Sequence, residues 1–226
     1  MIFSYEVKSC NPLFEKYQSF KLLLIKMSVV TIIMKFSNLL ISKPQPTLAL
    51  VIILSIFGPL VILSGGIWDA ISHFLKEPEF FWTIQHVVVY TGVTMSASGG
   101  VLGSILVIRK FVTRNMRKGI IIFLVGCIIQ LVFGYADFIS HEIFGLDGLV
   151  SWSHQPLELG LVLITLGGFL MIKSLKYGKI KRFVPVSIIS LIFSISWLGF
   201  NLSLLVGGTI LCLPFYEIFS SGCAIL

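Results

Sequence analysis

Residues 68–92 read "WDAISHFLKEPEFFWTIQHVVVYTG" and set the pattern for the whole chain. They carry an Asp, a His four positions later and a second His thirteen positions after that, where one very apolar segment ends and the next begins. Residues 136–160 read "ADFISHEIFGLDGLVSWSHQPLELG" and hold the same three residue types at the same intervals. All four histidines of the chain lie in these two stretches. A function that needs imidazole must therefore lie there.

The composition is that of an integral membrane protein. The chain has 226 residues, of which 56% are hydrophobic and only 12% are charged, and its mean hydropathy is +0.99. Uncharged runs of about 18 residues or more are typical of membrane-spanning helices. We therefore expect an all-α protein of the cell membrane, with the lipid bilayer as its main partner.

The net charge of +7 orients the chain in the membrane and does not call for a nucleic acid partner. Of the 17 basic residues, six precede residue 44, five lie in 109–118 and five in 173–182. Basic residues in alternate loops follow the positive-inside rule. The N-terminus is then cytoplasmic and both Asp/His stretches face outward, where Trp68, Trp82 and Trp152 suit the interface.

The hydropathy pattern divides the chain into three parts. Residues 1–46 contain lysines within an apolar stretch and predict a cytoplasmic or interfacial segment. Residues 47–182 form the core, with expected spans at 47–68, 84–108, 119–137 and 154–172. Residues 183–226 predict a fifth span and then an incomplete or re-entrant sixth around Gly207, Gly208 and Pro214, with an ending that suggests truncation. Five to six transmembrane helices are thus expected.

The core contains a parallel internal repeat. A shift of 68 positions places Asp69 on Asp137, His73 on His141 and His86 on His154. The same shift aligns further identical residues, namely Gly66, Ile71, Ser72 and Gly92 with Gly134, Ile139, Ser140 and Gly160. The repeat units, about 47–110 and 115–178, are helical hairpins related by an axis along the bilayer normal.

The repeated residues have the chemistry of metal ligands. Asp and His at positions i and i+4 share one helix face, about 6 Å apart at Cβ, and the next His follows after a short loop. One carboxylate and two imidazoles suit copper, zinc or iron. Simple interfacial polarity would have to explain the same spacing twice in a membrane, where ionisable residues are costly. The candidate metal ligands are therefore Asp69, His73, His86, Asp137, His141 and His154, in one shared site or two.

Three other polar residues lie within the expected spans. Glu158 has no acidic counterpart in the first repeat, where Tyr90 stands, and it suits a partner of a ligating His, a proton acceptor or a packing group. Gln130 and Asn201 suit hydrogen bonds between helices.

The pattern D-x3-H-x12-H, followed by a second such motif, resembles the copper-binding membrane subunit of the copper membrane monooxygenases, which are the ammonia and particulate methane monooxygenases. The resemblance covers roughly residues 60–160 and implies a divergent paralogue with a copper site at Asp69, His73 and His86. The second motif of that family normally begins with Asn, and its His residues have been connected with a further copper site. Here it corresponds to Asp137, His141 and His154, so Asp137 departs from the pattern.

The resemblance implies an oxidoreductase, part of a copper-dependent membrane monooxygenase with an electron donor and other membrane subunits as partners. Three other readings stay open from the residues. The motifs suit the outward-facing entry site of a copper or zinc transporter, or two His could ligate haem b in an electron carrier. An intramembrane zinc hydrolase also uses Asp and His, although the order and spacing here fit it poorly.

Overall fold

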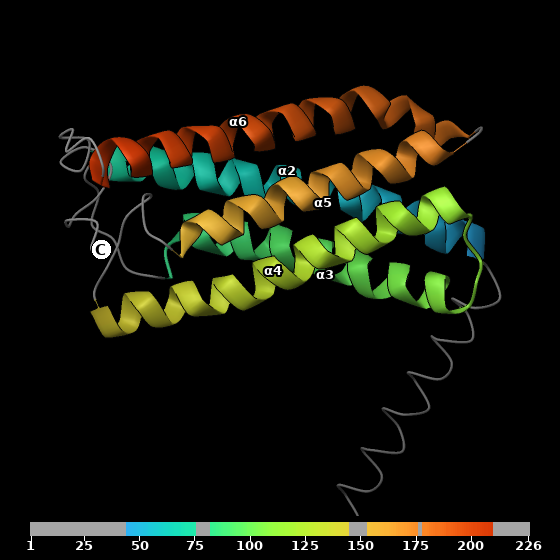
Figure 1. Ribbon diagram of the computed structural model, residues 1–226, viewed down its shortest axis with the longest axis horizontal. Coiled ribbons are helices and arrows are strands. Elements are labelled where there is room, and N and C mark those ends of the chain that lie inside the picture. The colour runs from blue at the N-terminus through green and yellow to red at the C-terminus, as the bar shows by residue number, and fades with distance from the viewer. Residues whose placement is uncertain (1–43, 76–81, 145–152, 176–177, 210–226) are drawn as a thin grey trace, which may run out of the picture. The chain divides into compact units, whose positions relative to one another are not determined.

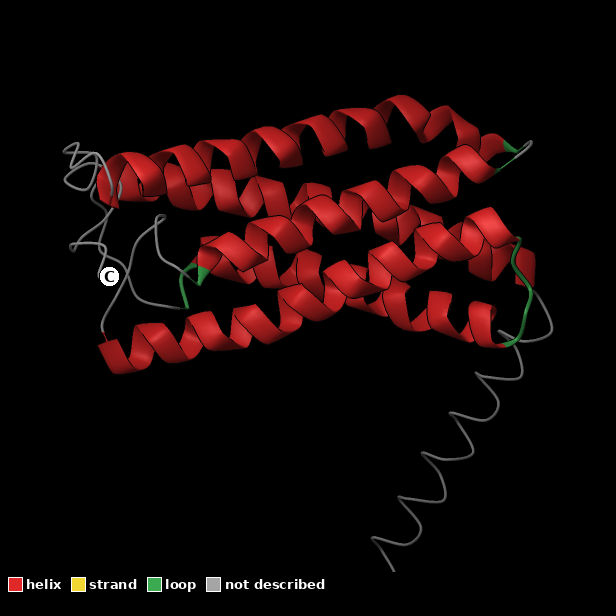
Figure 2. Ribbon diagram, in the orientation of Figure 1, coloured by secondary structure: helices red, strands yellow, loops and turns green. Residues whose placement is uncertain are grey.

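The computed structural model describes residues 44–75, 82–144, 153–175 and 178–209, and every long element in these ranges is a helix (Figures 1 and 2). The helices are α2 (Pro44–Leu75), α3 (Ile84–Ile108), α4 (Arg114–Phe144), α5 (His154–Ser174) and α6 (Val184–Thr209), with a short 3-10 helix, η1 (Lys179–Phe183), before α6. The described ranges contain no strand.

Five helices are long and apolar enough to cross a membrane. The four spans expected in the core and the fifth span after residue 183 all lie within these helices, so this part of the prediction is confirmed. Gly207 and Gly208 lie in the last turn of α6 and not in a separate segment. Pro214, the N-terminal segment before residue 44 and the loop carrying Trp152 lie outside the described residues.

Two of the helices continue beyond the spans expected from hydropathy. α2 runs on to Leu75 and α4 to Phe144, about two turns past the expected ends at 68 and 137. His73 and His141 are therefore helical, each one turn after its Asp. This extension puts the Asp and the His of each motif on the same helix, as their spacing predicts.

The charged residues lie in different halves of the helical bundle. The turns after α3 and α5 lie at one end in Figure 1, and all nine Lys and Arg residues among the described ranges lie there. We call this the basic end. The four described acidic residues lie in the other half of the helices, on α2, α4 and α5: Asp69, Asp137, Glu142 and Glu158.

In each helical hairpin, the two helices cross at a pair of glycines, one on each helix. A Cβ atom on Gly92 of α3 would lie 2.7 Å from the carbonyl oxygen of Gly58 on α2, and a Cβ atom on Gly126 of α4 would lie 2.7 Å from the carbonyl oxygen of Gly160 on α5. Larger residues cannot be accommodated at this approach without moving the backbone. Small residues at such crossings are the usual means by which helices pack in a membrane.

The interior and the periphery of the bundle differ as a membrane requires. Toward the basic end, the core is aliphatic and aromatic, with Val51, Ile52, Phe123, Ile164 and Met171 almost fully buried. α6 packs against α5 and carries the largest exposed apolar face, including Ile189, Ile192 and Phe193. Such a face suits contact with lipid acyl chains.

The α4–α5 crossing gives a direct stability prediction. Gly126→Ala should destabilise the protein by about 1–3 kcal/mol because the new methyl group meets the α5 backbone. Thermal unfolding of the detergent-solubilised protein measures this as a lowered Tm. Gly199→Ala on α6 is the matched control, since a Cβ there meets nothing within 4 Å. Equal Tm values for the two variants would contradict the crossing.

Candidate functional site

The first motif comes together at the end of the α2–α3 hairpin opposite the basic end. Asp69 on α2 is only 8% exposed. Its Oδ2 atom lies 3.5 Å from Nε2 of His73, one turn further along the same helix, and its Oδ1 atom lies 3.7 Å from Nε2 of His86 on α3. The structure thus brings the three residues of the first motif around one carboxylate.

Neighbouring polar side chains hold this arrangement in place. Oγ1 of Thr83, the residue before α3, lies 3.2 Å from Nδ1 of His86, and the donor depends on the tautomer of the ring. Such a contact at one ring nitrogen orients the other, which here faces Asp69. Gln85 donates a hydrogen bond from Nε2 to Oγ of Ser72 at 2.5 Å and joins α3 to α2 beside the motif.

The second motif is brought together in part. Asp137 on α4 is 3% exposed; Oγ of Ser153 donates to its Oδ1 atom at 2.5 Å, and Nε2 of His154 lies 3.4 Å from its Oδ2 atom. His141 lies one turn beyond Asp137 on α4, and its side chain is outside what the structure describes. Asp137 and His154 therefore form the described part of this motif.

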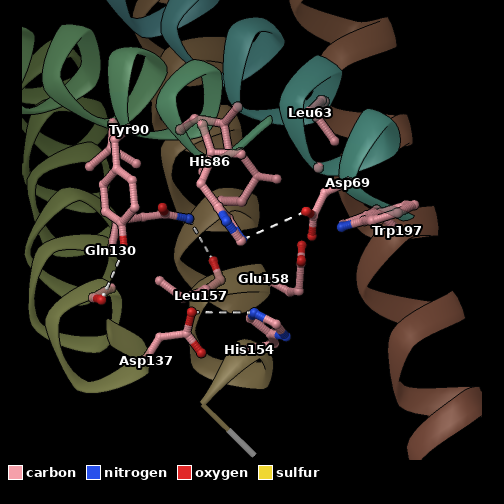
Figure 3. A pocket seen from close by; sticks show the side chains of 16 residues that line it. Leu63, Asp69, His86, Tyr90, Gln130, Asp137, His154, Leu157, Glu158 and Trp197 are labelled. Carbon is pink, nitrogen blue, oxygen red and sulfur yellow. Dashed lines mark hydrogen bonds and ion pairs between the residues drawn. The ribbon is translucent and has the colours of Figure 1, made fainter. Parts of the chain in front are cut away.

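Two residues of each motif line one cavity of about 70 Å³ (Figure 3), whereas His73 is not among its lining residues. Asp69 and His86 line it from the first hairpin, and Asp137 and His154 line it from the second. This volume is enough for a few water molecules or a small ligand. The remaining lining residues are Ile62, Leu63, Gly66, Val89, Tyr90, Val93, Gln130, Gly134, Leu157, Glu158, Leu161 and Trp197.

The cavity also contains polar groups one or two turns deeper than the motifs. Tyr90 donates from its hydroxyl to the Gly134 carbonyl oxygen at 3.0 Å, and Gln130 donates from Nε2 to the Leu157 carbonyl oxygen at 2.6 Å. Each bond joins two helices, as expected for Gln130. Asn201 instead donates from Nδ2 to the carbonyl oxygen of Trp197 on its own helix, at 3.0 Å.

Glu158 and Trp197 form the contact between α5 and α6 at the cavity. Both residues line the cavity, and the Trp197 indole lies near the Glu158 carboxyl group. Oε2 of Glu158 is shielded from solvent and has no hydrogen-bond partner among the described residues. The sequence patterns do not place Trp197 in a site. The available signal is its position: it lies in the middle of a span, whereas Trp in membrane proteins favours the interfaces.

The lining residues follow the sequence shift of 68. Fourteen of the sixteen fall into seven pairs whose numbers differ by 68, and only Leu63 and Trp197 lack such a counterpart. The pairs are Ile62 with Gln130, Gly66 with Gly134, Asp69 with Asp137, His86 with His154, Val89 with Leu157, Tyr90 with Glu158, and Val93 with Leu161.

The two hairpins also interact electrostatically across the cavity. The Asp69 carboxylate of the first hairpin attracts the His154 imidazole of the second. A change of charge in one motif therefore alters the electrostatic environment of the other.

The donor spacings fit a metal ion in part. Two ligands bonded at about 2.0–2.2 Å to one tetrahedral ion lie about 3.3–3.6 Å apart, close to the 3.4, 3.5 and 3.7 Å between carboxylate and imidazole here. Among the described residues, however, no group of three or more His, Cys, Asp and Glu has the full arrangement of a metal site. Binding therefore requires a further donor to turn toward one of the pairs.

No protein-family model, curated protein or solved structure matches this chain. The likeness to the copper membrane monooxygenases therefore rests on the motif residues alone.

Proposed function

We propose that this chain is a membrane protein that binds a metal ion, with copper as the first candidate, between two parallel helical hairpins. The observation that carries the proposal is the convergence of an Asp–His pair from each hairpin on one small cavity. The hairpins are built from helices that suit a lipid environment, where ionisable side chains are costly and usually functional.

Two observations support the parallel repeat. The glycines at the α2–α3 crossing, Gly58 and Gly92, correspond under the shift of 68 to Gly126 and Gly160 at the α4–α5 crossing. The same shift relates the seven pairs of cavity residues. A rotation about an axis along the bilayer normal accounts for both.

The charges of the cavity favour a cation. Asp69, Asp137 and Glu158 line it, and no described Lys or Arg lies in that half of the bundle. Buried carboxylates need protons or positive partners to offset their desolvation. Imidazole and carboxylate donors together suit copper, zinc or iron better than magnesium or calcium, and the likeness to the copper membrane monooxygenases nominates copper.

The candidate ligands, for one shared ion or two, would be Asp69, His73 and His86 on the first hairpin and Asp137, His141 and His154 on the second. Bound copper would supply one-electron chemistry and an open position for a small substrate. Thr83 orients His86, and aliphatic side chains form much of the remaining lining of the cavity. As part of a monooxygenase-like enzyme, the chain would need an electron donor and other membrane subunits.

The cavity argues against the two main alternatives. Its volume of about 70 Å³ is small for haem b, because cofactor pockets are usually about 300 Å³ or more. A transporter needs polar groups along a path, whereas the core toward the basic end is apolar.

Metal analysis of the purified protein tests the proposal. We expect about one or two copper ions per chain after expression with copper and zinc, and loss of at least half of this copper in His86→Ala and Asp69→Ala, because each variant removes a donor. Atomic absorption and electron paramagnetic resonance measure the metal and its nitrogen ligands. Glu142→Ala is the control, since it removes an exposed acidic residue near the second motif.

Metal content near zero in the unmodified protein would refute the proposal. A Soret band in the optical spectrum would replace it with a haem protein.

Glu158 gives a second prediction. It lines the cavity at the position where the first hairpin has Tyr90, so the two hairpins differ there. It lies one turn after His154 on α5 and lines the same cavity. We expect Glu158→Gln to weaken copper affinity by about 10-fold or more, the usual effect of losing a partner of a ligand. Titration against a competing chelator measures the affinity. Tyr90→Phe is the matched variant at the counterpart position and should leave the affinity nearly unchanged. Equal effects of the two variants would contradict a role for Glu158.

A further inference from the structure

The basic end has positive charge that no described acidic side chain offsets. Its Lys and Arg residues come from the end of α3, the start of α4, the end of α5 and η1: Arg109, Lys110, Arg114, Arg117, Lys118, Lys173, Lys179, Lys181 and Arg182. The described acidic residues all lie in the other half of the helices. The described side chains of this end therefore produce a positive field, which favours anions.

Two of these lysines share a pocket between α4 and α5. The pocket has a volume of about 330 Å³ and is lined by Asn115 and Lys118 from the start of α4 and by Leu170, Lys173 and Ser174 from the end of α5. Neither lysine forms an ion pair with another described residue. Their ammonium groups are thus available to a ligand.

The donors in the pocket suit a phosphate group. The two ammonium groups and the Asn115 amide can donate hydrogen bonds, whereas the Ser174 hydroxyl already donates to the Leu170 carbonyl oxygen at 2.7 Å. The first turn of α4 has no acidic residue, so the positive end of its helix dipole adds to the field of the lysines. Lys173 also lies over the Phe169 ring, with Nζ 5.7 Å from the centroid, which restrains its side chain.

The surroundings of the pocket suit a lipid. Leu170 forms an apolar wall of the pocket, and Ile121, one turn after Lys118 on α4, is 44% exposed on a helix fit to cross a membrane. A molecule with its phosphate on the lysines could lay an acyl chain along this surface. Basic pockets between membrane helices are known to bind anionic lipid headgroups.

We propose that the pocket of Asn115, Lys118, Lys173 and Ser174 binds the phosphate group of an anionic phospholipid. This site is separate from the cavity of the two motifs and does not depend on metal binding. It also does not depend on which end of the bundle is cytoplasmic, because the headgroup lies at the basic end in either orientation.

Native mass spectrometry of the full chain in detergent tests the site with two lipid probes, phosphatidylglycerol and phosphatidylcholine. The unmodified protein should retain phosphatidylglycerol at least about 10-fold better than phosphatidylcholine. Lys118→Gln/Lys173→Gln should lose about 30-fold in affinity for phosphatidylglycerol. This fold-change corresponds to the combined free energies expected for two lysines near an anionic headgroup. Arg109→Gln/Lys179→Gln removes the same charge from the same end, outside the pocket, and should lose no more than about 3-fold.

Equal losses in the two double variants would overturn the proposal, because they would show that the overall charge of the basic end is enough. Absence of any preference for phosphatidylglycerol would overturn it as well. Millimolar inorganic phosphate distinguishes the source of the ligand: we expect it to leave the bound lipid in place, and displacement of the lipid would assign the pocket to free phosphate. An unchanged Tm in the double variants shows that they are folded.

Discussion

A carboxylate buried at the end of an apolar helix needs a polar or charged partner, and this protein provides such partners for both Asp69 and Asp137. Asp69 lies close to the imidazoles of His73 and His86. Asp137 accepts a hydrogen bond from Ser153 and lies close to the imidazole of His154. These partners can reach only because α2 and α4 continue about two turns past their most apolar segments and because each hairpin closes at a pair of glycines. The packing of the helices therefore also determines which polar groups come together at the site.

The two hairpins are alike near the motifs and different deeper in the cavity. Asp and His recur in both, while Ile62 has Gln130 as its counterpart and Tyr90 has Glu158. α6 adds Trp197 on the side of Glu158 without a counterpart elsewhere in the lining. In the proposed function, the shared groups would bind the metal, and the groups that differ would set which ligand or substrate the cavity accepts.

The sequence is enough to predict the helices and the described contacts within the two motifs, because both follow from local spacing. Hydropathy locates the five spans, and the interval of four residues predicts that Asp69 and His73 share a face of α2. The sharing of one cavity by both motifs stays open at that level, since the spacing within a helix does not determine which faces of distant helices meet. The presence of Trp197 in the cavity cannot be predicted for the same reason, because its contact with Glu158 depends on where α6 packs.

In the proposed function, the two motifs act on the same bound ion or on closely coupled ions in one cavity. A double-mutant cycle of Asp69→Asn and His154→Ala, read as copper affinity against a competing chelator, tests it most directly. Because both residues line the same cavity, we expect a coupling free energy of about 1 kcal/mol or more. Effects that add to within about 0.5 kcal/mol would show two independent motifs and contradict shared or coupled binding of the ion.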